Sequence, residues 1–158
     1  MFHKILVPLD GSQLAECVFP YLVKIAKDCS VKEVVLFSVC EPLTIGSDYP
    51  ASMPKTWEQH VKELTKYSQM QCSLYVKDAE KQLNSLGVSN LKIETRLGDA
   101  AKEIVDYASQ NDVDLIIMAS HGRSGPSRWA YGSVADKVFR STCVPVLMVR
   151  GPGCVSSI

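Results

Sequence analysis

The stretch Leu115-Ile116-Ile117-Met118-Ala119 places five apolar residues in a row, and a loop rich in small residues follows it over 120–127. A strand that is apolar at every position has both faces buried, which is typical of a parallel sheet covered by helices on two sides. This stretch therefore predicts a buried strand of an α/β protein.

Four further segments carry strand patterns, and segments with helical spacing of apolar residues separate them. The expected strands cover residues 5–7, 34–39, 91–97 and 144–149, and the expected helices cover 13–28, 55–86, about 101–108 and 133–141. The order is βαβαβαβαβ, so a crossover helix joins each strand to the next. This order predicts a single doubly wound α/β domain, with helices on both faces of a five-stranded parallel sheet.

Details of these helices can also be predicted. Ser12 is the expected N-cap of the first helix. In the long second helix we expect a break near residues 68–73 and a C-terminal stop at Gly87. The aromatic residues of that helix are expected in the core or in an interface: Trp57, Tyr67 and Tyr75. In the last helix three residues are expected to face inward: Val134, Val138 and Phe139.

Length and charge exclude several classes of protein. The chain has 158 residues, which fits one domain over 1–150 and a short tail over 151–158. Its 17 Lys and Arg balance 17 Asp and Glu, which argues against nucleic-acid binding. No apolar run approaches the ~20 residues that span a bilayer, and the first residues have a strand pattern instead of a signal peptide. We therefore expect a cytoplasmic protein that contacts no membrane.

The six cysteines support this compartment. None lies in a C-x-x-C pair, and several fall in apolar periodic segments, so reduced thiols are favoured over disulfides or a zinc site. The cysteines are Cys17, Cys29, Cys40, Cys72, Cys143 and Cys154.

Two loops that follow strands are candidates for ligand binding, because ligands of doubly wound sheets lie beyond the carboxyl ends of the strands. The loop Pro8-Leu9-Asp10-Gly11-Ser12 offers a carboxylate to a ribose or base amine, although it could form only a turn and a cap. The second loop runs from Met118 to Gly125 and resumes at Gly132-Ser133-Val134. Its glycines and the start of a helix favour an anion such as phosphate.

Known catalytic motifs do not fit. The P-loop is absent, G-x-G-x-x-G does not follow the first strand, and Pro126 occupies the last glycine of a nucleophile elbow. Asp10 lacks a second carboxylate beside it in sequence, and Ser120-His121 lacks a third triad member. These absences favour binding over catalysis.

The two loops, taken together, resemble those of the universal stress protein family. The resemblance covers nearly the whole chain and rests on five stretches: 4–12, Arg96-Leu97-Gly98-Asp99, Ala119-Ser120-His121-Gly122, Gly132 to Val138, and 144–149. The nucleotide-binding branch carries G-x2-G-x9-G-[ST]. Gly122, nine further residues and Gly132-Ser133 fit that spacing, and Ala119 replaces the first glycine.

The resemblance implies an adenine nucleotide alpha hydrolase-like sheet of order 3-2-1-4-5 that binds ATP, with or without Mg²⁺ or Mn²⁺. It also implies a homodimer through the edge strand from Val144 to Val149, and a nucleotide-dependent regulatory role in stress response. The alternatives are a protein-interaction module without nucleotide and a slow ATPase. The implied nucleotide-binding residues are Pro8, Leu9, Asp10, Val39, Met118, Ala119, Gly122, Arg123, Gly125, Gly132, Ser133 and Val134.

Overall fold

The computed structural model describes residues 2–41, 55–121 and 132–151. The strands are β1 (Lys4–Pro8), β2 (Glu33–Cys40), β3 (Leu91–Leu97), β4 (Leu115–Ala119) and β5 (Val146–Val149). The α-helices are α1 (Phe19–Asp28), α2 (Lys55–Ser85), α3 (Ala100–Gln110) and α4 (Ser133–Ser141), and a 3₁₀ helix covers Ala15–Val18.

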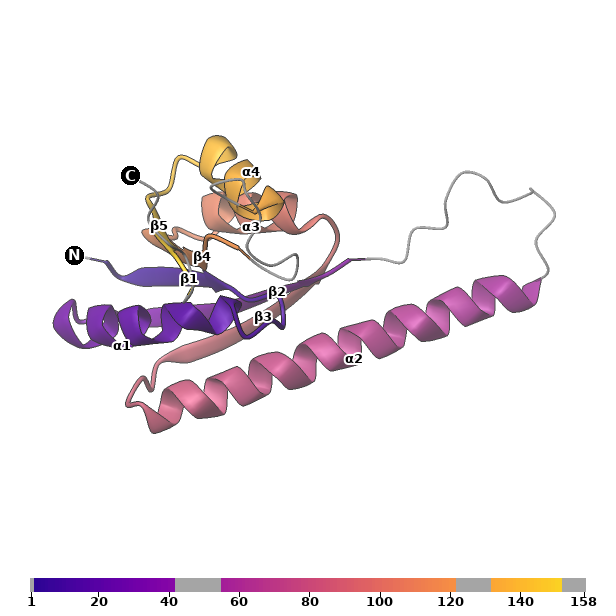
Figure 1. Ribbon diagram of the computed structural model, residues 1–158, viewed down its shortest axis with the longest axis horizontal. Helices are drawn as coiled ribbons and strands as arrows, with labels where there is room; N and C mark the ends of the chain where they lie inside the picture. The colour runs from indigo at the N-terminus through magenta and orange to yellow at the C-terminus, as the bar shows by residue number, and fades with distance from the viewer. Residues whose placement is uncertain (1, 42–54, 122–131, 152–158) are drawn as a thin grey trace.

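The five strands form one parallel sheet in the order β3-β2-β1-β4-β5, which confirms the predicted fold class. Helices α1 and α2 cover one face of the sheet, and α3 and α4 cover the other (Figure 1). The order of the strands reverses between β1 and β4, because the chain moves outward from β1 in one direction and then returns to build on its other side. This reversal is where doubly wound sheets bind ligands.

The sheet separates two hydrophobic cores. Ile5 and Val7 of β1 pack with the α1 and α2 side, whereas Leu6 between them packs with the α3 and α4 side. Successive residues of a strand point to opposite faces, so both faces of β1 are buried. The unbroken apolar run of β4 has the same cause, and each of its residues is buried.

The first helix begins later than expected. The segment after Ser12 starts as the 3₁₀ helix, and α1 begins only at Phe19. Pro20 explains the difference, since proline has no backbone N–H and is tolerated only in the first turn of an α-helix. Ser12 caps the preceding turn, where its Oγ accepts a hydrogen bond from the backbone N–H of Ala15 at 3.2 Å.

Helix α2 is continuous, so the break expected near residues 68–73 is wrong. The hydroxyl groups of Thr65 and Ser73 donate to the carbonyl oxygens of Val61 and Gln69 four positions earlier, a bond that helices accommodate. Gly87 follows the helix with φ of +91°, as expected for a helix stop. None of the described helices combines the length and the hydrophobicity that a membrane span needs.

Two further details differ at the end of the chain. Phe139 of α4 is 58% exposed and does not face inward, because it lies one position, about 100° of helix rotation, beyond the buried Val138. Strand β5 begins at Val146 instead of Val144. The N–H of Val144 donates to Thr142 Oγ1 at 3.1 Å, and Pro145, which has no N–H, contributes only its carbonyl to Ile116 of β4.

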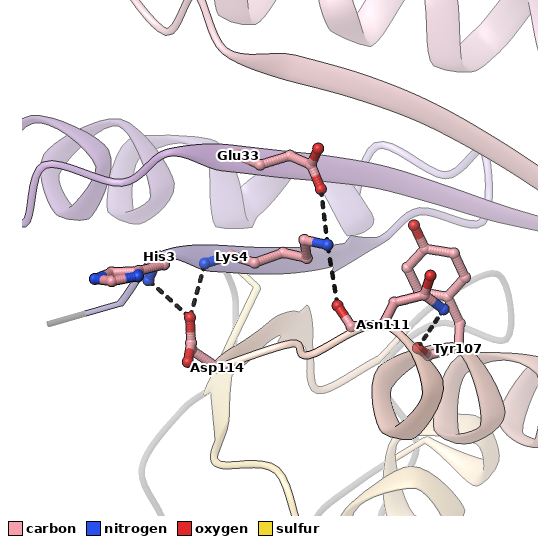
Figure 2. Close-up of polar contacts among 6 residues, drawn as sticks. All are labelled: His3, Lys4, Glu33, Tyr107, Asn111 and Asp114. Atoms are coloured by element: carbon pink, nitrogen blue, oxygen red, sulfur yellow. Dashed lines mark hydrogen bonds and ion pairs between the residues drawn. The ribbon is translucent and has the colours of Figure 1, made fainter.

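The carboxylate of Asp114 holds the starts of β1 and β4 together (Figure 2). The starts of the strands lie at the end of the sheet opposite to the carboxyl ends, where doubly wound sheets bind ligands. Asp114 Oδ2 accepts hydrogen bonds from the backbone N–H groups of His3 at 2.7 Å and Lys4 at 2.8 Å. The side chain of Lys4 in turn donates to the carbonyl of Asn111 and lies 3.2 Å from Glu33 Oε1. The donors on Lys4 and His3 lower the pKa of Asp114 from its ordinary value.

We predict that Asp114→Ala lowers the free energy of unfolding by about 1 kcal/mol at pH 7, since two backbone donors lose their acceptor. The pKa of Asp114 is lower in the folded chain than in the unfolded one. Its contribution is therefore full above the unfolded pKa of about 3.9 and is lost as the pH falls through the folded pKa. Urea unfolding at pH 7 and at decreasing acidic pH measures this. A difference between wild type and variant that stays constant down to pH 2 would contradict the prediction.

Candidate functional site

A pocket of about 270 Å³ opens at the carboxyl ends of β1, β2 and β4. It lies where the strand order reverses, between the loop after β1 and the start of α4. Both loops that the sequence analysis selected therefore border one pocket.

Nine of the twelve predicted site residues line this pocket, and three fall outside the residues that the structure describes. The nine are Pro8, Leu9, Asp10, Val39, Met118, Ala119, Gly132, Ser133 and Val134. The other three are Gly122, Arg123 and Gly125.

The loop after β1 orients a carboxylate at the pocket. Asp10 Oδ1 accepts hydrogen bonds from the backbone N–H of Ser12 at 2.9 Å and from its hydroxyl at 2.6 Å. The turn between them needs Gly11, whose φ of +87° lies in the left-handed region. The carboxylate is therefore held in place before any ligand arrives.

The two parts of the second loop lie next to each other. The backbone N–H of Gly132 donates to the carbonyl of Ser120 at 2.6 Å, and the N–H of Ser120 donates to Val149 of β5 at 2.8 Å. Residues twelve positions apart are thus joined beside the end of β4. Ala119 itself is an extended residue of β4, so its position does not need the conformational freedom of glycine.

Helix α4 presents its N-terminus to the pocket. Gly132 is its N-cap, and the residues of the first turn, Ser133, Val134 and Ala135, line the cavity. The first backbone N–H groups of a helix have no acceptor within the helix and carry the positive end of its dipole. Since the N–H of Gly132 is bonded to Ser120, an anion would meet the N–H groups of the three residues that follow.

Several lining residues were not predicted. Phe37 of β2 and Ile104 of α3 are buried and supply apolar surface, and Ala15 and Ala100 also line the pocket. The residues of α3 reach the pocket because α3 packs on the same face of the sheet as α4, which local sequence patterns do not show. Glu41 could have been found, since it directly follows β2 and so obeys the rule that selected Asp10.

Polar lining residues give the pocket its charge. Within the described part of the chain, Asp10 and Glu41 are the lining carboxylates, and no Lys or Arg lines the pocket. Ser120 and His121 are both buried, and Ser120 Oγ lies 3.0 Å from His121 Nδ1. A phosphate chain bound here would thus need positive charge beyond the N-terminus of α4.

Comparisons with known proteins agree with this arrangement. A model of the family described as "Universal stress protein family" matches residues 1–150. Universal stress protein MJ0531 of Methanocaldococcus jannaschii is 30% identical over 154 residues, which are 96% of this chain and 84% of that protein. The structure of protein MJ0577, at 28% identity, superimposes with a TM-score of 0.82 and covers 98% of this chain and 99% of that one.

Two more distant structures share the fold and contain nucleotides. One is a universal stress protein in complex with cAMP, with 17% identity, a TM-score of 0.64, and coverage of 95% of this chain and 98% of that one. The other is a universal stress protein family protein from Arabidopsis thaliana with AMP bound, with 11% identity, a TM-score of 0.60, and coverage of 96% and 93%.

Proposed function

This chain belongs to the universal stress protein family, and from that premise we propose that it binds ATP in the pocket at the carboxyl ends of its strands. In this proposal the bound nucleotide regulates its activity as a stress-response protein. The main support is that both predicted loops border one cavity, next to the N-terminus of α4.

The shape of the pocket supports an adenine nucleotide. The apolar side is formed by Val39, Phe37 and Ile104 and suits a flat base, while Asp10 suits the hydroxyls of a ribose. The start of α4 lines the same cavity and suits phosphate. Two family members of this fold hold adenine nucleotides, AMP in one and cAMP in the other.

We propose that Mg²⁺ or Mn²⁺ accompanies the phosphates. The described lining carries Asp10 and Glu41 and no basic side chain, so three phosphates would meet two carboxylates there. A divalent ion offsets this repulsion, and Arg123, outside the described residues, is a second source of positive charge. No group of three metal-ligating side chains occurs among the residues described, so the phosphates would supply most of the ligands.

Isothermal titration tests the proposal. We expect ATP to bind with micromolar affinity in the presence of Mg²⁺, and GTP to bind at least about tenfold more weakly because its base has different hydrogen-bonding edges. Asp10→Asn should also weaken ATP binding about tenfold, because a neutral amide accepts a weaker hydrogen bond from a ribose hydroxyl than a carboxylate does. If millimolar ATP gives no heat, the chain does not bind ATP, and the protein-interaction alternative replaces this proposal.

The same variant separates a binding protein from an ATPase. Ser120 and His121 lie close together, but Asp10 is held by Ser12 at the other loop, and no triad is apparent among the residues described. We therefore expect negligible phosphate release from ATP. Turnover by the wild type that disappears in Asp10→Asn would show that the protein is an enzyme.

We also propose a homodimer that forms through β5 in the cytoplasm. Strand β5 is an edge of the sheet, and Val146, Leu147 and Met148 are only half-buried. An apolar edge strand of this kind pairs readily with another strand. Phe139, which is exposed on α4, adds apolar surface.

The cysteines support the proposed cytoplasmic location. None of Cys17, Cys29, Cys72 and Cys143 forms a disulfide, and reduced thiols are typical of the cytoplasm.

A further inference from the structure

Helix α2 carries exposed apolar side chains along one stripe. We name Trp57, Leu64, Tyr67 and Leu74 the outer stripe; they are 37%, 42%, 59% and 49% exposed. A different side of the same helix, formed by Cys72, Val76, Ala79 and Leu83, is buried against β2 and β3. The N-terminal part of α2 extends past the carboxyl ends of the strands (Figure 1). The outer stripe therefore lies largely on a helix arm that the sheet does not cover.

The spacing of the outer stripe is that of a helix–helix seam and is symmetric. Its members are separated by seven, three and seven positions, which is the heptad spacing of a coiled coil. Read backwards, the spacing is the same. An antiparallel pair of identical helices requires this property, since residue i must contact residue j of the partner while j contacts i. An antiparallel pair of α2 helices would place Leu64 against the partner's Tyr67 and Trp57 against the partner's Leu74.

The polar residues are compatible with this pairing. His60 and Gln71 fall in the same seam and would face each other, so that the amide offers a hydrogen-bond partner to the imidazole. Lys62 and Lys66 lie on the far side of the helix from the outer stripe. Glu63, which borders the stripe, would pack beside the partner's Met70. No charge in the seam would oppose a like charge.

The geometry also favours the antiparallel direction. The C-terminal half of α2 is packed on β2 and β3, so a parallel pair would bring the two domains together at one end of the seam. An antiparallel pair places them at opposite ends. The contact is of modest area, because an aromatic side chain offers roughly 150–250 Å² in full and those of the outer stripe are only partly exposed. It therefore belongs with weak, concentration-dependent contacts, which bury less than the about 1,000 Å² of stable interfaces.

We propose that α2 forms an antiparallel helix pair with α2 of a second copy of this chain, through the outer stripe. This contact is separate from the edge-strand dimer and from the nucleotide pocket. It adds an association step that depends on protein concentration and does not depend on ATP.

Sedimentation velocity of the full chain between about 1 and 100 µM tests the pairing, a range suited to contacts of modest area. The average mass should rise with concentration by a factor approaching two. Leu64→Glu should weaken this step at least about tenfold, because it places a carboxylate in an apolar seam. Tyr67→Lys should do the same. Both positions are exposed, so both variants should keep the wild-type thermal melt.

A mixture of the two variants tests the direction. In an antiparallel pair Glu at 64 of one chain faces Lys at 67 of the other, and the second contact, Tyr67 with Leu64, stays native. The mixture should therefore associate more tightly than either variant alone. Tyr21→Lys is the matched control, since Tyr21 of α1 is 54% exposed and lies outside the stripe.

Two results would overturn the proposal. The first is an association in Leu64→Glu as tight as in wild type, which would assign any dimer to another surface such as β5. The second is a loss of association in both single variants without recovery in their mixture, which would exclude the antiparallel pair.

Discussion

Gly132→Asp should weaken ATP binding about thirtyfold or more, equivalent to roughly 2 kcal/mol, without unfolding the protein. Gly132 is the N-cap of α4, with φ of −67° and ψ of 156°, a conformation that any residue can adopt. An aspartate at an N-cap accepts hydrogen bonds from the first-turn N–H groups. In this chain those groups belong to residues that line the pocket. The carboxylate would thus occupy the donors that the phosphates need, and would also repel the phosphates.

The same change should raise the free energy of unfolding by about 0.5 kcal/mol, because a capped helix is more stable than one that begins with glycine. The affinity for ATP, measured by titration calorimetry, should therefore fall while the melting temperature rises. This combination distinguishes a blocked site from a damaged fold.

Gly132→Asn is the matched control. Asparagine caps a helix about as well as aspartate but carries no charge. Its affinity for ATP should fall between those of wild type and Gly132→Asp. If Gly132→Asp binds ATP as tightly as the wild type, the phosphates do not lie at α4 and the pocket holds the nucleotide in another orientation.

The second large effect concerns two phenylalanines that the sequence does not distinguish well. Phe37→Ala should lower the free energy of unfolding by about 3–5 kcal/mol, whereas Phe139→Ala should change it by about 0.5 kcal/mol. The side chain of Phe37 is fully buried, and its ring centroid lies 4.9 Å from that of Tyr107 in α3. Phe139 is 58% exposed. Urea unfolding of both variants under one set of conditions gives the comparison.

Phe37 also lines the pocket, so its removal should weaken ATP binding in whatever fraction remains folded. Phe37→Leu separates the two effects, because leucine fills most of the core space and does not offer a flat ring. We expect Phe37→Leu to retain most of the stability. Equal losses of stability in Phe37→Ala and Phe139→Ala would show that the α3–α4 core is not packed as described.

Much of the fold could be predicted because single segments carry strong signals. The strands at 91–97 and 115–119 and the helix at 133–141 have the predicted bounds. Each of them ends at or next to a glycine or a change of periodicity. The start of the first helix was missed because its apolar spacing extends across Pro20, and only the chemistry of proline stops the helix there.

The candidate site was predicted for a topological reason. Asp10, Val39 and Ala119 follow or end strands whose carboxyl ends meet at one edge of a parallel sheet, so their proximity follows from the order of elements alone. Ile104 and Ala100 were missed because they lie near the start of α3, and the path of a helix across a sheet depends on packing. That nine predicted residues share a pocket is a structural result, and their binding of nucleotide remains a prediction.

The amino-acid sequence alone determined the alternation of strands and helices, the burial of both faces of the sheet, and the edge at which a ligand would bind. These properties follow from the periodicity of apolar residues and from the chirality of crossover connections, both of which act over short stretches of chain. Only the tertiary structure decided that the N–H of Gly132 meets the carbonyl of Ser120, that α3 helps to line the pocket, and that part of α2 extends beyond the sheet. Such features depend on distances between segments that are far apart in the chain, and local patterns do not encode those distances.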